Sequence, residues 1–461
     1  MSTSEAHHTA IAIVGGGCSG LLVAVQLFRA GFARGVTVIE PREQPGAGLA
    51  YSTSFDQHLL NVPAGKMSAL PGQPSHFLDW LRALPWPDAV ANSFAPRKLY
   101  GAYLRDLLQQ TIRAGGARYF NHIRAEAIGV AAEETGARLD LSDGKTVHAE
   151  RVVLALGNPA SSAAPGVSRQ GLEECWHLSP WVGDALRVRF AGERVLLVGT
   201  GLTAVDSILA LQSQETDCRV FAVSRRGFLP EVHDLRASAG VPPAFGHRGN
   251  VRLLLRELRM QIEAARRANL CWRSVVDALR PLSNDLWQEL PLAQRQRFLR
   301  HLKTYWEPHR HRMAPEIRTR LDGFQGSGAL QIIAGRIQLV CPRESATQVR
   351  IRLRHGGERI IDVDRIISCT GIHENYADNP RPLIRTLIEQ GLAQANDLGI
   401  GFRTDRHGAL LDAKMNPSSV FFTLGPPRRG GLFETTAVPE IRTQAEALAI
   451  HLTTRGTEAR A

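Results

Sequence analysis

Short apolar runs alternate along the chain with longer stretches of helical periodicity. Residues 11–14 form an apolar run suited to a buried strand, and the apolar, helix-like stretch 21–30 follows after several glycines. A second apolar run, residues 36–39, ends at an acidic residue. Residues 99–114 repeat apolar positions at helical spacing and predict an amphipathic helix. Strands that alternate with helices in this way predict an α/β protein.

A hairpin followed by a buried strand occurs twice in the pattern. In the first copy, residues 138–149 turn at an Asp-Gly pair and lead into the apolar run 151–157. In the second copy, residues 348–363 lead into the run 365–371. Both buried runs end in glycine. The repetition predicts two related nucleotide-binding domains.

The glycines after the first apolar run have the spacing G-x-G-x-x-G, as Gly15, Gly17 and Gly20. Gly15 permits a tight turn, Gly17 admits a pyrophosphate to the backbone, and Gly20 lets helix and strand pack closely. The next strand ends in Glu40, twenty residues after Gly20, where a carboxylate accepts hydrogen bonds from a ribose diol. We therefore expect residues 11–40 to bind the adenosine half of FAD.

A second glycine pattern, G-x-G-x-x-A, follows the apolar run 194–198. Its strand–turn–helix context matches that of the first, but Ser224 stands at the ribose position and two arginines follow it. Arginine can hold a ribose 2′-phosphate that an acid would repel, which favours NADPH over NADH. The candidate contacts are Gly199, Gly201, Thr203, Arg225 and Arg226.

These patterns predict two Rossmann-like domains with one insertion. Residues 1–165 and 365–461 form the two parts of the FAD-binding domain, and residues 166–364 form the NAD(P)H-binding domain. Residues 245–325 interrupt the α/β pattern with a helical, arginine-rich insert. Fifteen arginines and one lysine against seven acids give residues 248–320 a net charge of +9. Such a block collects anions or binds nucleic acid, but a solvated helical face is the interpretation we favour.

Composition narrows the class of protein further. The chain has 461 residues, 44% of them hydrophobic, a net charge of +11 and no long uninterrupted apolar run, so we expect a cytoplasmic enzyme without a membrane span. Its six cysteines form no C-x-x-C pair, so neither a metal site nor a redox disulfide is expected. The sequence does not indicate an oligomeric state.

Several segments resemble a bacterial family of FAD/NAD(P)-binding proteins, similar to flavin monooxygenases, that includes FAD-dependent urate hydroxylases and aspartate N-monooxygenases. The resemblance implies that residues 425–437 return to the isoalloxazine, with Gly425 and Thr435 among the FAD contacts. It also implies that the amide of Asn61 lies near the reactive edge of the flavin, although capping of a core backbone group would explain Asn61 equally well. The segments that carry the resemblance are residues 11–20, 48–51, 58–63, 195–206 and 424–442.

The activity expected from this resemblance is monooxygenation of a small anionic substrate. NAD(P)H reduces FAD, molecular oxygen forms a C4a-(hydro)peroxyflavin, and its distal oxygen passes to the substrate. Hydroxylation of urate to 5-hydroxyisourate in purine degradation is the first hypothesis, with Arg428 and Arg429 stabilising the anion, followed by Arg310 and Arg312. N-hydroxylation of a small acidic amino acid such as aspartate is the second. The third is a flavoprotein that reduces or senses without oxygenation.

Overall fold

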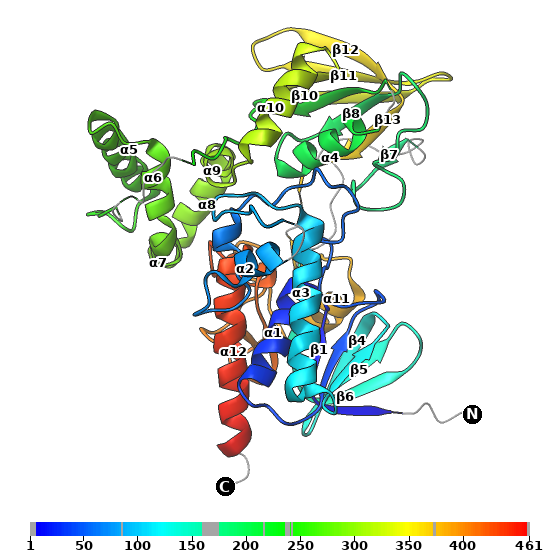
Figure 1. The fold of residues 1–461 in the computed structure, drawn as a ribbon, viewed down its shortest axis with the longest axis vertical. Helices are drawn as coiled ribbons and strands as arrows, with labels where there is room; N and C mark the ends of the chain where they lie inside the picture. Colours follow the sequence, from blue (N-terminus) through cyan, green and yellow to red (C-terminus); the bar gives the residue numbers. More distant parts are fainter. Residues whose placement is uncertain are drawn as a thin grey trace.

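The computed structural model of the protein describes residues 6–83, 86–158, 175–214, 217–235, 240, 243–371 and 375–458. Two β-sheets lie at opposite ends of the molecule, and a group of helices projects to one side between them (Figure 1). The α/β architecture with two Rossmann-like domains and a helical insert is therefore confirmed.

The first sheet has eight strands, and its path runs β14-β15-β6-β1-β2-β3. Parallel pairing joins β15 to β6, β6 to β1, β1 to β2 and β2 to β3, with Ile11 opposite Val36 and Ile13 opposite Val153. The antiparallel β4–β5 hairpin attaches to β6. The strands are β1 (His7–Val14), β2 (Val36–Ile39), β3 (Phe120–Ile123), β4 (Ala127–Glu133), β5 (Gly136–Leu141), β6 (Thr146–Leu154), β14 (Ala409–Leu411) and β15 (Pro417–Thr423).

The second sheet has seven strands in the order β12-β11-β10-β9-β8-β13-β7. From β10 to β7 the pairs are parallel, and β11 and β12 extend the sheet as an antiparallel hairpin. The strands are β7 (Trp176–His177), β8 (Arg194–Val198), β9 (Arg219–Ser224), β10 (Leu330–Pro342), β11 (Thr347–Leu353), β12 (Glu358–Val363) and β13 (Arg365–Ser368).

The predicted hairpin-and-strand repeat is present in both sheets, and the structure differs from the prediction at two points. In the first copy the second hairpin strand and the buried run are one continuous strand, β6. In the second copy, β13 pairs with β8 and so belongs to the second sheet. The domain boundary placed between residues 364 and 365 is therefore wrong and moves beyond Ser368. The boundary at 165/166 lies outside the described residues.

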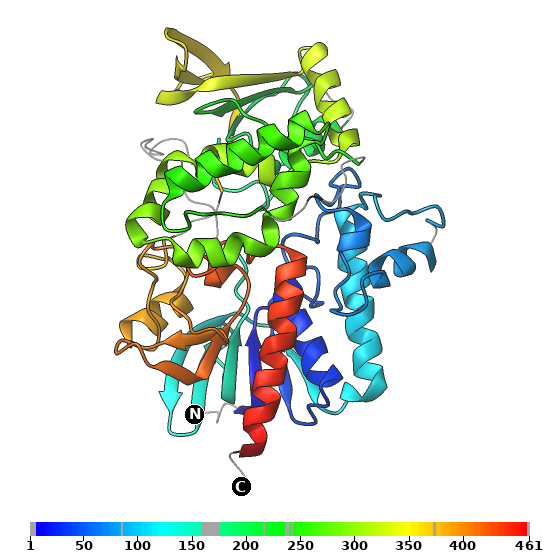
Figure 2. The ribbon, with the colours of Figure 1, turned by 90° about the vertical axis from the view of Figure 1, so that its left-hand side faces the viewer.

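Helix α1 (Cys18–Arg29) lies at the centre of the first domain. Its residues from Ser19 to Leu27 are all buried, because α3 and α12 pack beside it and β1 lies beneath it (Figures 1 and 2). Gly31, with φ of +79°, follows the helix end in the left-handed conformation. The other helices of this domain are α2 (His76–Ala83), α3 (Arg97–Thr111), α11 (Pro382–Glu389) and α12 (Val438–Glu458), with single turns at Ala64–Lys66, Ile112–Gly116 and Pro426–Arg428.

The second domain carries α4 (Leu202–Gln212) after β8, and then the helical insert. Between β9 and β10 the chain forms α5 (Val251–Arg267), α6 (Trp272–Ala278), a turn at Arg280–Leu282, α7 (Ser283–Glu289), α8 (Leu292–His301), α9 (Lys303–Arg310) and α10 (Pro315–Gly326). The insert thus lies beside the C-terminal part of the first domain (Figure 2). Across the described residues, none of the helices is both long and apolar enough to traverse a membrane.

Candidate functional site

The first glycine pattern forms a tight strand-to-helix turn. Gly15 has φ of +100°, and a Cβ there would lie 2.4 Å from the carbonyl oxygen of Ala155 on β6. A Cβ on Gly20 would lie 1.9 Å from the carbonyl oxygen of Gly15, so only glycine lets α1 pack this closely on β1. Gly17 is the N-cap of α1. The unpaired N–H groups of the first helical turn therefore lie beside the turn, where a pyrophosphate binds in such sites.

Glu40 follows β2 and is almost fully buried. Its Oε2 accepts a hydrogen bond from the Gly16 N–H at 2.9 Å, and its Oε1 accepts from Arg42 Nη1 at 3.0 Å. A carboxylate held in this way keeps lone pairs for further donors. These lone pairs could accept hydrogen bonds from the adenosine ribose of FAD, which is the role that the sequence analysis assigns to Glu40.

Residues 425–437, the C-terminal return, lie against the start of α1. Gly425, with φ of +70°, leaves 3.1 Å between the position of a Cβ and Ser19 Oγ. Thr435 Oγ1 donates to the Gly425 carbonyl at 2.9 Å, and Gln444 bridges both residues through Oε1 to Gly425 N–H and Nε2 to Thr435 Oγ1. Gly425 and Thr435 are thus brought to the same end of the first domain as Gly15 to Gly20.

The second glycine pattern repeats the geometry of the first. Gly199 has φ of +121°, and a Cβ there would lie 2.4 Å from the carbonyl oxygen of Cys369 after β13, the counterpart of Ala155. Gly201 is the N-cap of α4, and a Cβ there would meet no atom within 4 Å. Thr203 is in the first turn of α4. Open space before an uncapped helix start fits the pyrophosphate of a second dinucleotide.

Ser224, at the end of β9, fixes the loop that follows. Ser224 Oγ is hydrogen-bonded to Thr200 Oγ1 at 2.8 Å and accepts from the Gly227 N–H at 2.9 Å. Arg225 is exposed. The guanidinium of Arg226 lies over the ring of Tyr305, 4.3 Å from its centroid, and donates to its hydroxyl at 2.5 Å. The two arginines thus lie at the carboxyl end of β9, beside the second glycine turn.

Asn61 lies in the loop before the turn Ala64–Lys66 and is half-buried. Its carbonyl oxygen accepts a hydrogen bond from His233 Nε2 of the second domain at 3.0 Å. Burial, aided by the nearby charge of Arg312, lowers the pKa of His233 to about 4, so this histidine is neutral near pH 7. The main chain of Asn61 is therefore held by the second domain, and the side-chain amide takes no part in that contact.

An ion pair joins the same loop region to α4. Arg97 Nη1 lies 2.6 Å from Asp206 Oδ2, and both side chains are largely buried. His58, fully buried, donates through Nε2 to the Asp206 carbonyl at 2.9 Å and accepts from Thr53 Oγ1 at 2.7 Å. Burial lowers the pKa of His58, which keeps its ring neutral for this arrangement. These contacts fix the first domain to the helix that begins at Gly201.

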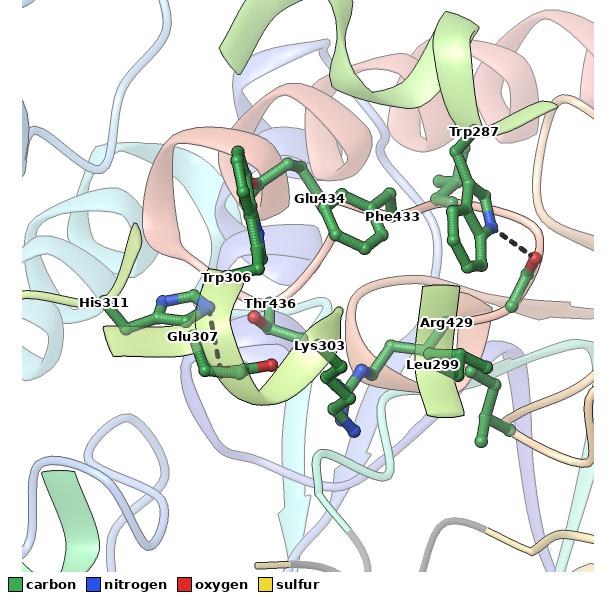
Figure 3. Close-up of a pocket in the computed structure, with 13 residues that line it drawn as sticks. Trp287, Leu299, Lys303, Trp306, Glu307, His311, Arg429, Phe433, Glu434 and Thr436 are labelled. Carbon is green, nitrogen blue, oxygen red and sulfur yellow. Dashed lines mark hydrogen bonds and ion pairs between the residues drawn. The ribbon is translucent and has the colours of Figure 1, made fainter. Parts of the chain in front are cut away.

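A small pocket lies between the helical insert and the C-terminal return, and the centres of water-sized molecules can occupy about 40 Å³ of it. Figure 3 shows Trp306, Phe433 and Trp287 along one side of it, with Lys303 and Arg429 opposite. The ring centroids of Trp287 and Phe433 are 4.9 Å apart. The remaining polar residues of the lining are Glu307, His311, Glu434 and Thr436. Two cations and three aromatic side chains thus face one small cavity, a combination suited to a charged group of a small molecule.

The arginines named from the sequence have different positions. Arg428 is buried, and its Nη2 donates to the carbonyl oxygens of Asp405 and Arg406, each at 3.1 Å, so it supports the main chain. Arg429 lines the pocket. Arg310 forms a buried two-point pair with Glu434, at 2.7 and 3.0 Å, and Arg312 pairs with Asp277. Of the four, only Arg429 therefore has a position suited to contact a substrate in this pocket.

Two residues at these sites were missed from the sequence: Asp206 and Glu434. Each acts through a partner more than 75 residues away along the chain. Asp206 carried the clearest signal, because an acid within the apolar run 204–211 is a buried charge that requires a partner.

The family model for FAD-NAD(P)-binding proteins matches residues 12–159. The match includes the first glycine pattern, Glu40 and β6. No curated protein matches the chain.

Three solved structures of N-hydroxylating or related monooxygenases are similar to this chain. An ornithine N-hydroxylase from Kutzneria sp. 744, solved with reduced FAD, NADP+ and L-ornithine, is 16% identical with a TM-score of 0.65, covering 97% of this chain and 100% of that one. An L-lysine 6-monooxygenase from Pseudomonas syringae is 15% identical, with a TM-score of 0.65 and coverage of 97% and 99%.

The third is a cadaverine monooxygenase from Erwinia amylovora, solved with FAD, at 13% identity, a TM-score of 0.67 and coverage of 96% and 94%. None of these three acts on urate by its description. The similarity extends over both sheets and the helical insert. The chain therefore has the fold of these monooxygenases.

Proposed function

We propose that the protein is an FAD- and NAD(P)H-dependent monooxygenase that N-hydroxylates the amine of a small, amino-acid-like substrate. The pocket between the insert and the C-terminal return carries the proposal, because it combines cationic, acidic and aromatic groups beside the predicted flavin contacts Gly425 and Thr435. The shared fold supports N-hydroxylation over hydroxylation of urate.

The cofactors have separate sites in this proposal. The turn at Gly15 to Gly20 and the carboxylate of Glu40 hold the adenosine half of FAD, and α4 with Arg225 and Arg226 holds NADPH in preference to NADH. Bound FAD supplies the activation of molecular oxygen once it is reduced. Asn61 donates its amide to the reactive end of that site. His58, Arg97 and His233 hold the two domains together, and this contact would limit the entry of water between the two sites.

Lys303 and Arg429 bind the carboxylate of the substrate in the pocket, and the aromatic walls hold its carbon chain. Glu307 lies on α9 in the same lining and attracts the substrate amine. A molecule with an amine and a carboxylate therefore matches the charges of this pocket better than urate, which carries no amine.

The test uses the FAD-loaded enzyme with NADPH and a panel of ornithine, lysine, aspartate, cadaverine and urate. Hydroxylamine product, with oxygen uptake matching NADPH oxidation, supports the proposal. Lys303→Met should raise the KM for the amino acids about tenfold and leave that of cadaverine, which has no carboxylate, nearly unchanged. Urate-dependent oxidation without hydroxylamine, or NADPH oxidation without oxygen uptake, contradicts it.

A further inference from the structure

Helix α9 belongs to the insert, yet its residues face both candidate sites. Lys303, Trp306 and Glu307 line the pocket (Figure 3). Tyr305 is on the opposite side of the helix, because successive residues turn by about 100°. It contacts the loop after β9, where the second dinucleotide site lies.

The contact between Tyr305 and that loop has three components. The Arg226 guanidinium stacks on the ring at 4.3 Å, Arg226 Nη1 donates to the hydroxyl at 2.5 Å, and the Phe228 ring lies 5.8 Å from the Tyr305 ring. The Phe228 carbonyl in turn accepts from Thr200 Oγ1, between the two glycines of the second pattern. One tyrosine of the insert thus contacts the loop that distinguishes NADPH from NADH.

We infer that Tyr305 is a positioning residue for the 2′-phosphate of NADPH, and that α9 thereby links this nucleotide to the substrate pocket. The inference rests on the proposed function. A stacked guanidinium loses less rotational freedom on binding a phosphate than a solvated one, so the ring pre-organises Arg226. Because NADH lacks the 2′-phosphate, this gain is confined to NADPH.

The contact between Arg226 and Tyr305 also lets α9 respond to a bound nucleotide. When a phosphate engages Arg226, the arginine–tyrosine contact is held more firmly, and the helix that carries Tyr305 also carries Lys303 and Trp306. Coupling of this kind is reciprocal, so a pocket ligand should tighten NADP+ and leave NAD+ unaffected.

Calorimetric titration of the oxidised, FAD-loaded protein with NADP+ and with NAD+ tests the first part. Tyr305→Ala should weaken NADP+ binding about tenfold and NAD+ binding less than twofold, whereas Tyr305→Phe, which keeps the ring, should weaken NADP+ only about two- to threefold. The matched control is Tyr119→Ala, since Arg118 stacks on Tyr119 in the first domain at a similar distance of 4.5 Å. It should change neither affinity.

Hydrogen exchange of peptides from α9 tests the link. NADP+ should slow exchange in residues 303–310 of the wild type, NAD+ should not, and Tyr305→Ala should abolish the effect. If NADP+ leaves hydrogen exchange in residues 303–310 unchanged, the proposed link between the nucleotide and the substrate pocket is overturned. An unchanged ratio of NADP+ to NAD+ affinity in Tyr305→Ala overturns the positioning role alone, whereas a wild type that binds neither nucleotide overturns the proposed function with it.

Discussion

Gly20 and Gly201 hold different places in the two glycine patterns, and their surroundings differ accordingly. Gly20 is packed so that a Cβ would overlap the Gly15 carbonyl at 1.9 Å, whereas Gly201 faces open space. Gly20→Ala should therefore lower the free energy of unfolding by about 1–3 kcal/mol, as overpacking does. Gly201→Ala should leave stability within about 0.5 kcal/mol of the wild type, as surface changes do, but weaken NADP+ binding.

Denaturant unfolding and calorimetry on both variants separate these effects. A Gly201→Ala protein as unstable as Gly20→Ala would show that the space before α4 is not available to a ligand. Unchanged NADP+ affinity in Gly201→Ala would place the pyrophosphate elsewhere.

Arg428 and Arg429 are adjacent in sequence but differ in role. Burial lowers the pKa of Arg428, and its guanidinium pairs with two main-chain carbonyls. Arg428→Met leaves those carbonyls without donors, so we expect a loss of about 2–3 kcal/mol in unfolding free energy. Arg429→Met should cost less stability and raise the KM for a carboxylate substrate instead. Thermal melts and steady-state kinetics measure the two effects. A larger loss of stability in Arg429→Met together with a raised KM in Arg428→Met would show that the roles assigned to the two arginines are wrong.

At the scale of elements, His233 connects the segment after β9 with the Asn61 loop. Because its folded pKa of about 4 lies below the ordinary value of 6.5, the unfolded chain binds the proton more readily. Its contribution to stability is therefore complete above pH 6.5 and is lost as the pH falls toward 4, by up to about 3 kcal/mol.

Unfolding free energies measured from pH 7.5 to 4 check this contribution. His233→Gln keeps a donor for the Asn61 carbonyl but does not titrate, so its stability should fall less steeply between pH 6.5 and 4. His301→Gln, at an exposed position of α8, is the matched control and should follow the wild type. Parallel curves for all three proteins would rule out a half-buried, neutral His233 in the folded protein.

Local patterns predicted the elements better than they predicted the side-chain contacts between them. The turns at Gly15 and Gly199 follow from short-range spacing, and the structure has both. The charge of the insert, however, gave no indication that Arg310 would pair with Glu434 across 124 residues. The sequence also does not indicate which side chains are exposed. Arg428 and Arg429 share one sequence context, yet only Arg428 is buried. Such contacts depend on how the insert docks on the C-terminal return, which no local periodicity encodes.

At the scale of the whole molecule, transfer of a hydride between two nucleotides requires the two domains to keep one relative position. The Arg97–Asp206 pair crosses between them, and Arg97 Nε also donates to the Leu59 carbonyl at 3.0 Å. The pair thus fixes α4, which begins at the second glycine turn, to the loop that carries Asn61. A small displacement here changes the distance between reacting groups without altering either binding site.

Asp206→Asn should therefore lower the rate of flavin reduction by NADPH about ten- to a hundredfold, the cost of misplacing reactants by about an ångström. The affinities for FAD and NADP+ should stay within about twofold, because their contacts are not touched. Asp364→Asn is the matched control, since Arg194 and Asp364 form a comparable pair at 2.7 Å within the second domain. That variant should lose stability while its reduction rate, measured anaerobically by stopped flow, stays close to the wild-type rate. Equal slowing in both variants would mean that the interdomain pair stabilises the fold without setting the distance over which the hydride moves.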